Sequence, residues 1–511
     1  MDHHSKLHPS LKVNIDDLKT RTGTSDDLVI RTFRTGHDDP RQSRDMAVVY
    51  VDGMTDEKSI HQFIMEPLLF QGNALANAGT EEGLSFDRLR DRILSVGQIA
   101  EADSLEGIVD SLMEGKVVVL SDGFPRAFQI SMAGWEQRAV SEPTNQTVIR
   151  GPKEAFTENI RVNTALIRRI IKNPDLQLKN RKIGRATKTN VSVMYIKGIV
   201  DDTVVEEVNR RLDAIHTDAI LESGYIEEFI QDEPRTIFPT VQNSERPDVI
   251  AAALLEGRVA VLIDGTPHVL LVPALFVQFF QAAEDYYQRA DISTLLRVLR
   301  YFGLFIATLV PGLYIAVTTF HQEMLPTQLL ISLAAQREGV PFPAFIEALM
   351  MEATYEILRE AGVRMPRAVG QAVSIVGTLV IGQAAVEAGI ISATMIIVVS
   401  ITAISSYVIP EFDMSIAVRI TRFLFMGLAA AFGLYGIFVG MIALLLHLSS
   451  LRSFGVPYMA PVGPIIMSDQ KDTIMRARHP NLTTRPSMFG RLNVFRQSKS
   501  SARKSRRDGR P

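Results

Sequence analysis

Four long segments without a charged residue constrain the fold of this 511-residue chain more than any other feature. They are Tyr301–Phe320, Ala368–Val386, Ala388–Pro410 and Phe423–Leu446. Each is 19 to 24 residues long, and an apolar helix of about 20 residues spans the hydrocarbon core of a bilayer. Helices buried in soluble proteins rarely stay uncharged for so long four times in succession. The pattern therefore predicts an integral membrane protein with four spans.

A region of different character, Leu325 to Val363, separates the first two predicted spans. Its opening, LPTQLLISLAAQ, is apolar but short, which suits a re-entrant or interfacial segment better than a full span. Farther on, Pro341-Phe342-Pro343 can start a helix, because proline is tolerated in a first turn. The glutamates of this predicted helix are Glu347, Glu352, Glu356 and Glu360.

The last three of these glutamates recur every four residues and therefore form one stripe on the helix. One interpretation is an ion or partner site, in which the stripe gathers cations or meets arginines. The other is the water-facing side of an amphipathic helix. The sequence leaves both interpretations open.

The N-terminal half contains a duplicated phrase. LMEGKVVVLSDGFP (Leu112–Pro125) and LLEGRVAVLIDGTP (Leu254–Pro267) agree at nine of fourteen positions, at an offset of 142 residues. A second pair, VVYVDGMTD and VMYIKGIVD, lies at an offset of 145. We infer two copies of one unit, from about Arg44 to Ser131 and from about Asn190 to Pro273.

Each copy predicts a helix, a strand, a tight turn and a second strand. Gly115 and Gly257 fit the left-handed end of a helix. The Asp-Gly pair that follows, between apolar residues, is a strong hairpin signal because the turn needs positive φ. A nucleotide site is the alternative for these turns, but the spaced glycines and the lysine of a phosphate loop are missing. We therefore interpret the turns as structural.

Charge and cysteine content exclude several classes of protein. The formal net charge of −3 creates no overall field that would recruit nucleic acid. The chain has no cysteine, which rules out disulfides and thiolate metal sites. We find no HExxH, GxSxG, P-loop or Rossmann motif, and we predict neither an enzyme nor a cofactor or metal site.

Basic residues predict the orientation in the membrane. Arg297 and Arg300 precede the first span, and the tail after Met467 holds twelve Lys or Arg against three Asp. Basic flanks stay in the cytoplasm, which places both termini inside and requires an even number of spans. The tail is expected to contact anionic membrane lipid. Arg419 and Arg422 precede the fourth span on the predicted outer side and fit this orientation less well.

These observations predict an α+β chain, in which a duplicated mixed α/β cytosolic module precedes an all-α membrane domain with about four spans and a re-entrant or interfacial helical segment. The expected divisions are a disordered N-terminal tail (1–43), a first α/β repeat with its connector (44–189), a second α/β repeat (190–290), a helical membrane domain (291–466) and a basic cytosolic tail (467–511).

Two long runs carry a resemblance to a known family. PFPAFIEALMMEATYEILREAGVRMPRAVGQAVSIVGTLVIGQAAVEAGIIS (Pro341–Ser392), preceded by GLYIAVTTFHQEMLPTQLL, resembles the A subunits of the GerA-type spore germination receptors. The run NPDLQLKNRKIGRATKTNVSVMYIKGIV (Asn173–Val200) does so as well. The resemblance is strongest from about residue 150 to residue 465.

The resemblance implies a multi-pass subunit in the inner membrane of a bacterial spore. Its partners would be a multi-span B subunit that binds the nutrient and a C subunit that is a lipoprotein. In that family the A subunit is thought to form a homo-oligomer around an ion-conducting path that germinants open. The alternative function is a non-conducting membrane scaffold that couples the nutrient-binding partner to downstream germination machinery.

Small and hydroxylated residues indicate which helices would surround such a path. Span two offers them beside valines that suit a hydrophobic constriction, which gates by losing water. These candidates for the pore wall are Ser374, Val376, Gly377, Thr378 and Val380. In span four, Gly436 and Gly440 stand in GxxxG register, which lets membrane helices approach closely. The hydroxyls of span three either line a wet path or bond back to their own helix.

Overall fold

The computed structural model describes residues 6–23, 25–35, 44–69, 86, 90, 99–132, 134, 143, 146–365, 382–489 and 493–497. The chain divides into two compact units. The first comprises Met1–Gln231, Val241–Pro273 and Thr484–Arg496, and the second comprises Asp232–Thr240, Ala274–Thr483 and Gln497–Pro511.

The first unit contains two modules with equivalent sheets. The first module consists of α1 (Leu11–Thr22), β1 (Leu28–Thr35), β2 (Arg44–Val51), α2 (Glu57–Ile60) with the π-helical turn η1 (His61–Met65), β3 (Ile99–Ala102), α5 (Leu105–Met113), β4 (Val117–Ser121) and β5 (Ala127–Ile130). The second consists of α6 (Ile160–Ile170), β6 (Leu176–Ile183), β7 (Thr189–Ile196), α7 (Asp202–Asp213), α8 (Ser223–Ile230), β8 (Gln242–Ser244), α9 (Pro247–Glu256), β9 (Val259–Ile263) and β10 (Val269–Val272). The antiparallel strand orders are β1-β2-β4-β5-β3 and β6-β7-β9-β10-β8, so the sequence duplication is a duplication of fold.

Each module closes with the predicted hairpin. β4 pairs with β5, and β9 pairs with β10, both antiparallel. Gly123 and Gly265 at the two turns have φ of 85° and 94°, the left-handed region that glycine adopts without strain. Gly115 and Gly257, just after α5 and α9, have φ of 82° and 97°. The predicted order of helix, strand, turn and strand is therefore confirmed in both copies.

The aspartate of each turn fastens the hairpin to the first helix of its module. Asp122 Oδ1 accepts a hydrogen bond of 2.9 Å from the backbone N–H of Leu11, the first residue of α1. Asp264 Oδ1 accepts one of 3.2 Å from the N–H of Ile160, the first residue of α6. Helix N-termini have free N–H groups and favour a negative charge. The repeated Asp-Gly pair thus both turns the chain and caps a helix, which explains why the phrase occurs twice.

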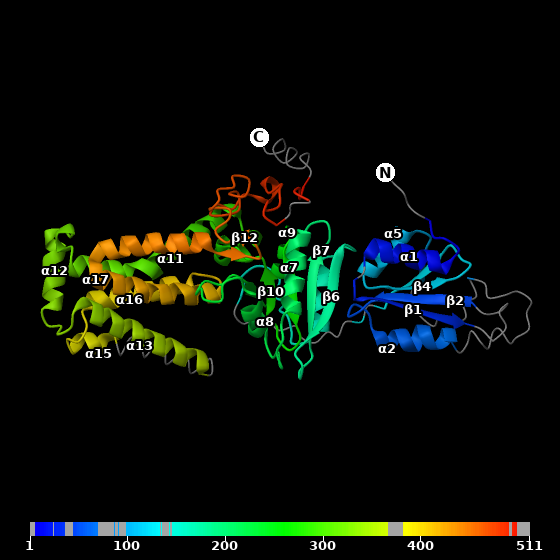
Figure 1. Ribbon diagram of the computed structural model, residues 1–511, viewed down its shortest axis with the longest axis horizontal. Coiled ribbons are helices and arrows are strands. Elements are labelled where there is room, and N and C mark those ends of the chain that lie inside the picture. The colour runs from blue at the N-terminus through cyan, green and yellow to red at the C-terminus, as the bar shows by residue number, and fades with distance from the viewer. Residues whose placement is uncertain are drawn as a thin grey trace, which may run out of the picture. The chain divides into compact units, whose positions relative to one another are not determined.

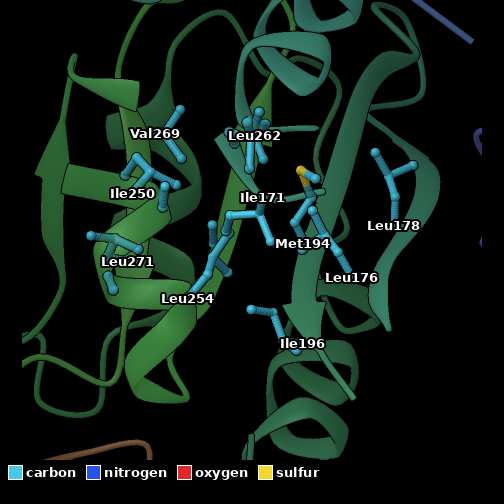
Figure 2. Close-up of a cluster of buried hydrophobic side chains, with 14 of the residues drawn as sticks. Ile171, Leu176, Leu178, Met194, Ile196, Ile250, Leu254, Leu262, Val269 and Leu271 are labelled. Atoms are coloured by element: carbon cyan, nitrogen blue, oxygen red, sulfur yellow. The ribbon is translucent and has the colours of Figure 1, made fainter. Parts of the chain in front are cut away.

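Helices cover the sheets and complete the cores of the modules. In the first module α1 and α5 lie on one face of the sheet and α2 lies on the other (Figure 1). In the second module α6 and α9 pack on the sheet. Figure 2 shows Ile250 of α9 beside Val269 of β10, and Leu254, Met194 of β7 and Leu262 of β9 belong to the same buried cluster. Strands β4 and β9 are buried along their whole length, which explains their continuous apolar sequence.

The structure corrects the disordered tail that was predicted for residues 1–43. α1 and β1 lie within this range, and β1 pairs with β2 over its eight residues. Leu11 and Leu18 of α1 are buried in the core of the first module. The polar opening of the chain conceals these apolar positions, and each module begins one helix and one strand before the predicted repeat.

The second unit is largely helical. Its elements are η3 (Phe276–Phe280), α10 (Glu284–Tyr287), α11 (Ala290–Thr319), η4 (Gln322–Met324), α12 (Thr327–Arg337), α13 (Ala344–Arg364), α15 (Gly382–Glu387), α16 (Ala393–Tyr407), α17 (Phe412–Ser450), β11 (Arg452–Ser453), β12 (Val456–Pro457) and η6 (His479–Asn481). Among the described residues, α11 and α17 are long and apolar enough to cross a membrane. α16, in predicted span three, is apolar but has only 15 residues. Most of predicted span two falls in 366–381, outside the described residues, and four spans are not confirmed.

α17 is broken at Gly433 into two helices that fold back on each other. Gly433 has φ of 60° and ψ of −143°, outside the helical region. A Cβ atom on Gly440 would lie 3.0 Å from the ring of Phe425, although a straight helix would separate these two residues by about 22 Å. Met414 and Leu448, near the two ends of α17, also share one buried cluster. A helical hairpin therefore replaces the single span that was predicted in this region.

Glycines allow this helical hairpin to pack tightly. A Cβ atom on Gly436 would overlap the carbonyl oxygen of Leu428, which lies in the first half of α17. α11 approaches the same half closely, since a Cβ atom on Gly312 would lie 3.2 Å from the carbonyl oxygen of Phe425. Small residues let membrane helices approach closely. Here the approach of the GxxxG glycines occurs within one chain.

Candidate functional site

The four glutamates of the predicted helix lie on α13, and the structure buries two of them. The side chains of Glu347 and Glu352 are fully buried, whereas those of Glu356 and Glu360 are 27% and 63% exposed. Within the stripe, Glu352 is buried, Glu356 is partly buried and Glu360 is exposed, so the stripe is not simply the water-facing side of an amphipathic helix. Its contacts follow the other interpretation, in which the stripe meets arginines.

Two of these glutamates form ion pairs with arginines of α17. Arg422 Nη1 pairs with Glu352 Oε2, and neither side chain is exposed. Arg422 Nε also donates to the carbonyl oxygen of Ala307 in α11 at 2.9 Å, so one guanidinium joins three helices. Near the start of α17, Arg419 Nη1 lies 2.5 Å from Glu356 Oε2. Removal of one partner from a buried pair leaves an uncompensated charge, which costs about 3–5 kcal/mol.

Glu347 makes a different contact, at the start of α16. Its Oε1 accepts hydrogen bonds from the backbone N–H of Ser392, at 2.7 Å, and from the Ser392 hydroxyl. Ser392 is the N-cap of α16, where free N–H groups favour a negative charge. Arg337 Nε of α12 lies 4.0 Å from Glu347 Oε2, and Glu360 pairs at the surface with Arg364 of its own helix. Polar contacts thus tie α13 to α12, α16 and α17.

The sequence does not reveal the arginines as partners of the stripe. From sequence, Arg419 and Arg422 are only basic residues that fit the predicted orientation poorly. The signal that could have found them is their spacing. Arg419 and Arg422 are three positions apart and therefore share one face of their helix. Two arginines on one face can pair with two carboxylates that are four positions apart on a neighbouring helix. What the sequence lacks is the pairing of α13 with α17, since 70 positions separate Glu352 from Arg422.

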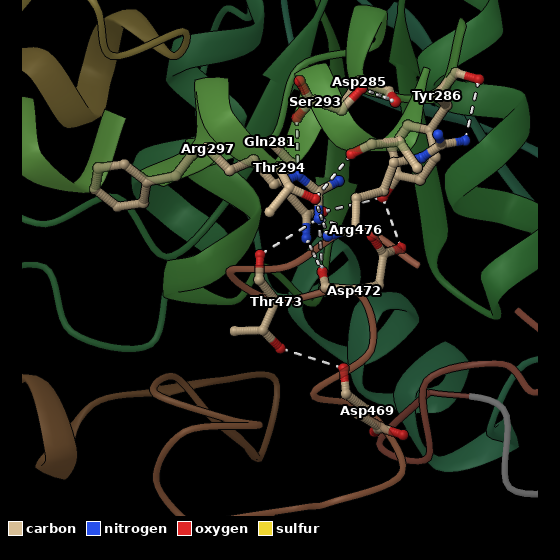
Figure 3. A network of polar contacts seen from close by, with 12 residues as sticks. Gln281, Asp285, Tyr286, Ser293, Thr294, Arg297, Asp469, Asp472, Thr473 and Arg476 are labelled. Atoms are coloured by element: carbon tan, nitrogen blue, oxygen red, sulfur yellow. Dashed lines mark hydrogen bonds and ion pairs between the residues drawn. The ribbon is translucent and has the colours of Figure 1, made fainter. Parts of the chain in front are cut away.

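A second network of buried charges surrounds the start of α11 (Figure 3). Asp285 Oδ2 accepts hydrogen bonds from Arg297 Nε at 2.9 Å and from Arg300 Nη1 at 2.7 Å. Asp472 Oδ1 binds Arg297 Nη1 at 2.7 Å. The side chains of Arg297 and Asp285 are fully buried. The two arginines that were interpreted as a basic flank are therefore part of the fold, and the orientation that they predict stays a prediction.

The same network includes part of the basic segment that was predicted as a cytosolic tail for residues 467–511. Asp472 holds its segment against α11, and Arg476 is 5% exposed and donates to backbone carbonyl groups near α10. Farther along, Arg485 Nε donates to a carbonyl oxygen at the end of α9 at 2.8 Å. These two basic side chains bind folded parts of the chain, and contact of the tail with anionic lipid stays a prediction. Residues 498–511 lie outside the described part.

The structure does not describe the residues predicted for the pore wall, which are Ser374, Val376, Gly377, Thr378 and Val380. In α16 the hydroxyls of Thr402 and Ser406 donate to carbonyl oxygens of their own helix, both at 2.7 Å. Such bonds satisfy a hydroxyl without a wet path. Within the described ranges, no group of three or more His, Asp or Glu side chains is placed to hold a metal ion.

Nearly the whole chain is similar to proteins of one family. Residues 16–488 match the family model described as Bacillus/Clostridium GerA spore germination protein. Spore germination protein KA of Bacillus subtilis (strain 168) is 47% identical over 493 residues, covering 96% of this chain and 89% of that protein. Spore germination protein GerLA of Bacillus cereus is 38% identical over 481 residues, covering 94% of this chain and 96% of that protein. The crystal structure of the N-terminal domain of the A subunit of the Bacillus megaterium spore germinant receptor GerK3 is 39% identical, with a TM-score of 0.43, and covers 54% of this chain and 99% of that domain.

The two units define a class of protein in which a duplicated mixed α/β module is joined to a helical part with two helices apolar enough to cross a membrane. The chain belongs to the GerA family of spore germination proteins. The resemblance seen in Pro341–Ser392 and Asn173–Val200 is confirmed. The relatives named above are germination proteins rather than enzymes.

Proposed function

We propose that this chain is the A subunit of a nutrient-sensing spore germination receptor and that several copies assemble in the spore inner membrane around an ion path that the germinant opens. Its partners are a nutrient-binding, multi-span B subunit and a lipoprotein C subunit. The α/β module and both termini face the cytoplasm, where the module acts as a gating or assembly platform. Membership of the GerA family supports the role in germination.

The observation that carries the proposal of an ion path is the pairing of buried charges between α13 and α17. Ionisable side chains are rare among membrane helices, and those that occur mark ion pathways or moving parts. Glu352 and Arg422 are fully buried in a unit with two long apolar helices. An ion pair between helices stabilises one arrangement of them, so another arrangement needs free energy from a ligand that binds it more tightly. Germinant binding to the receptor is that source.

A non-conducting scaffold is the second candidate function. Glu347, Glu352, Glu356 and Glu360 each have a partner in the protein, and fixed pairs suit a rigid frame as well as a gate. In that case the chain would transmit a change in the nutrient-binding partner without carrying ions. The two functions differ in whether the assembled receptor conducts.

The proposed pore wall is tested by valine substitutions in the assembled receptor. Val376→Ala and Val380→Ala remove apolar volume from the proposed constriction and should stabilise its wet state, giving ion leak without nutrient. Val398→Ala in α16 is the matched control and should change little. Leak confined to Val398→Ala would move the pore to α16, and normal closure in all three variants would contradict a constriction at these valines.

A further inference from the structure

Spare polar atoms gather on α13 and on the start of α17. Five side chains form what we call the α13 seam: Glu352, Glu356, Arg359, Arg419 and Arg422. Each has one buried atom without a hydrogen-bond partner in the described part of the chain. In both carboxylates the atom without a partner is Oε1. In the arginines it is a guanidinium nitrogen: Nη1 of Arg359, Nε of Arg419 and Nη2 of Arg422.

The concentration of such atoms here is higher than elsewhere in the described ranges. Of the sixteen buried side-chain atoms without a partner, eight belong to α13 or to side chains around it. Buried polar groups in native proteins are nearly always bonded, either to protein or to ordered water. Donors and acceptors concentrated on two facing helices point to a shared partner more than to separate exceptions.

We infer that ordered water fills the α13 seam and makes it a hydrated path inside a single protomer. The spare atoms are three N–H donors and two carboxylate acceptors, and water serves both kinds. A bound cation would face three guanidinium groups. A bound anion would satisfy those groups but would face the two carboxylates and leave their spare oxygens without a donor. Water is the one small ligand that matches the whole set.

A second group of spare atoms extends the hydrated path along α13. Glu347 Oε2 and Arg337 Nε are also buried without a hydrogen-bond partner among the described residues. Arg337 Nε lies 4.0 Å from Glu347 Oε2, which is too long for a hydrogen bond and suits a bridging water. A buried water needs two to four polar partners, and these two atoms supply two.

The seam lies within one chain and is distinct from any opening between protomers. Its hydration holds whether or not the assembled receptor conducts, so the inference does not depend on the proposed function. Water next to an ion pair weakens the attraction between its charges by raising the local dielectric. The pairs of α13 and α17 can therefore exchange partners more easily than pairs in a dry bundle, which makes this helix contact suited to rearrangement.

The test uses the absence of native cysteine. Glu352→Cys places a thiol beside Arg422, which favours the reactive thiolate. Ala348→Cys is the matched control, one helical turn earlier, equally buried and packed in an apolar cluster. We expect Glu352→Cys in the intact receptor, without germinant, to react with 2-aminoethyl methanethiosulfonate at least about tenfold faster than the control, because only a hydrated thiol is both ionised and reached. Equally slow reaction of the two thiols would overturn the inference.

A structure of the unaltered receptor at a resolution that shows water provides a second measurement that does not depend on the folding of a variant. We expect solvent density within hydrogen-bonding distance of Arg422 Nη2 and Glu352 Oε1. A dry seam, or side chains of another subunit bonded to these atoms, would contradict a hydrated path.

Discussion

Alanine at Gly436 is expected to open the helical hairpin of α17, whereas alanine at Gly427 in the same helix is not. A methyl group on Gly436 overlaps the carbonyl oxygen of Leu428 and lies 3.0 Å from Phe432 Cβ. Neither atom is the end of a flexible side chain, so the backbone must move. Among the described residues, and apart from the adjacent backbone of its own helix, no atom lies within 4 Å of a methyl group on Gly427. The pair of variants therefore isolates the effect of the fold-back at Gly433.

The expected difference in the free energy of unfolding follows from the crowding at Gly436 and the open space at Gly427. Both variants gain up to about 1 kcal/mol from replacing glycine in a helix. Gly436→Ala also pays for overpacking, which costs about 1–3 kcal/mol. The free energies of unfolding of the two variants should therefore differ by about 1–3 kcal/mol. For a unit of this size, that difference corresponds to about 2–12 °C in Tm.

Loss of helical circular dichroism on heating, in the detergent-extracted protein, measures this difference. We expect Gly427→Ala to unfold at or above the temperature of the parent, and Gly436→Ala to unfold below Gly427→Ala. If the two variants unfold at the same temperature, α17 does not fold back at Gly433 and the helical hairpin is wrong.

Two further predictions concern the first unit and the orientation. Asp27→Ala leaves the guanidinium of Arg168, 3% exposed, without carboxylate contacts of 2.7 and 3.0 Å, and it should cost about 3–5 kcal/mol in urea unfolding. The double variant Asp27→Leu, Arg168→Leu should lose less, and an equal loss would contradict a buried pair. Single cysteines at the exposed positions Lys12 and Met475 should resist an impermeant thiol reagent in intact cells and react after lysis. Labelling of either before lysis would refute the cytoplasmic placement of that end of the chain.

The modules were predictable from sequence where local chemistry decides the structure. Gly123 and Gly265 need positive φ, and the Asp-Gly hairpins follow from that need alone. The upstream helix α1 was missed because its buried leucines stand among charged and polar residues. Nothing local shows that the Asp122 carboxylate caps this helix, because 111 positions separate it from Leu11.

The candidate site was only partly predictable, because its partners come from distant segments. The spacing of Glu352 and Glu356 gives a stripe, but the arginines that it meets belong to α17. The break at Gly433 lies in a continuous apolar run. From composition alone, that run is therefore predicted to be one span. Contacts between helices, rather than propensity within them, decide both features.

Ion flux through liposomes that carry the assembled receptor tests the proposed function most directly. Receptors that contain this chain with its B and C partners should release a trapped monovalent cation when the germinant is added and stay closed without it. Receptors assembled without this chain should not respond. A correctly assembled receptor that binds germinant but gives no flux would contradict the ion path and favour the scaffold.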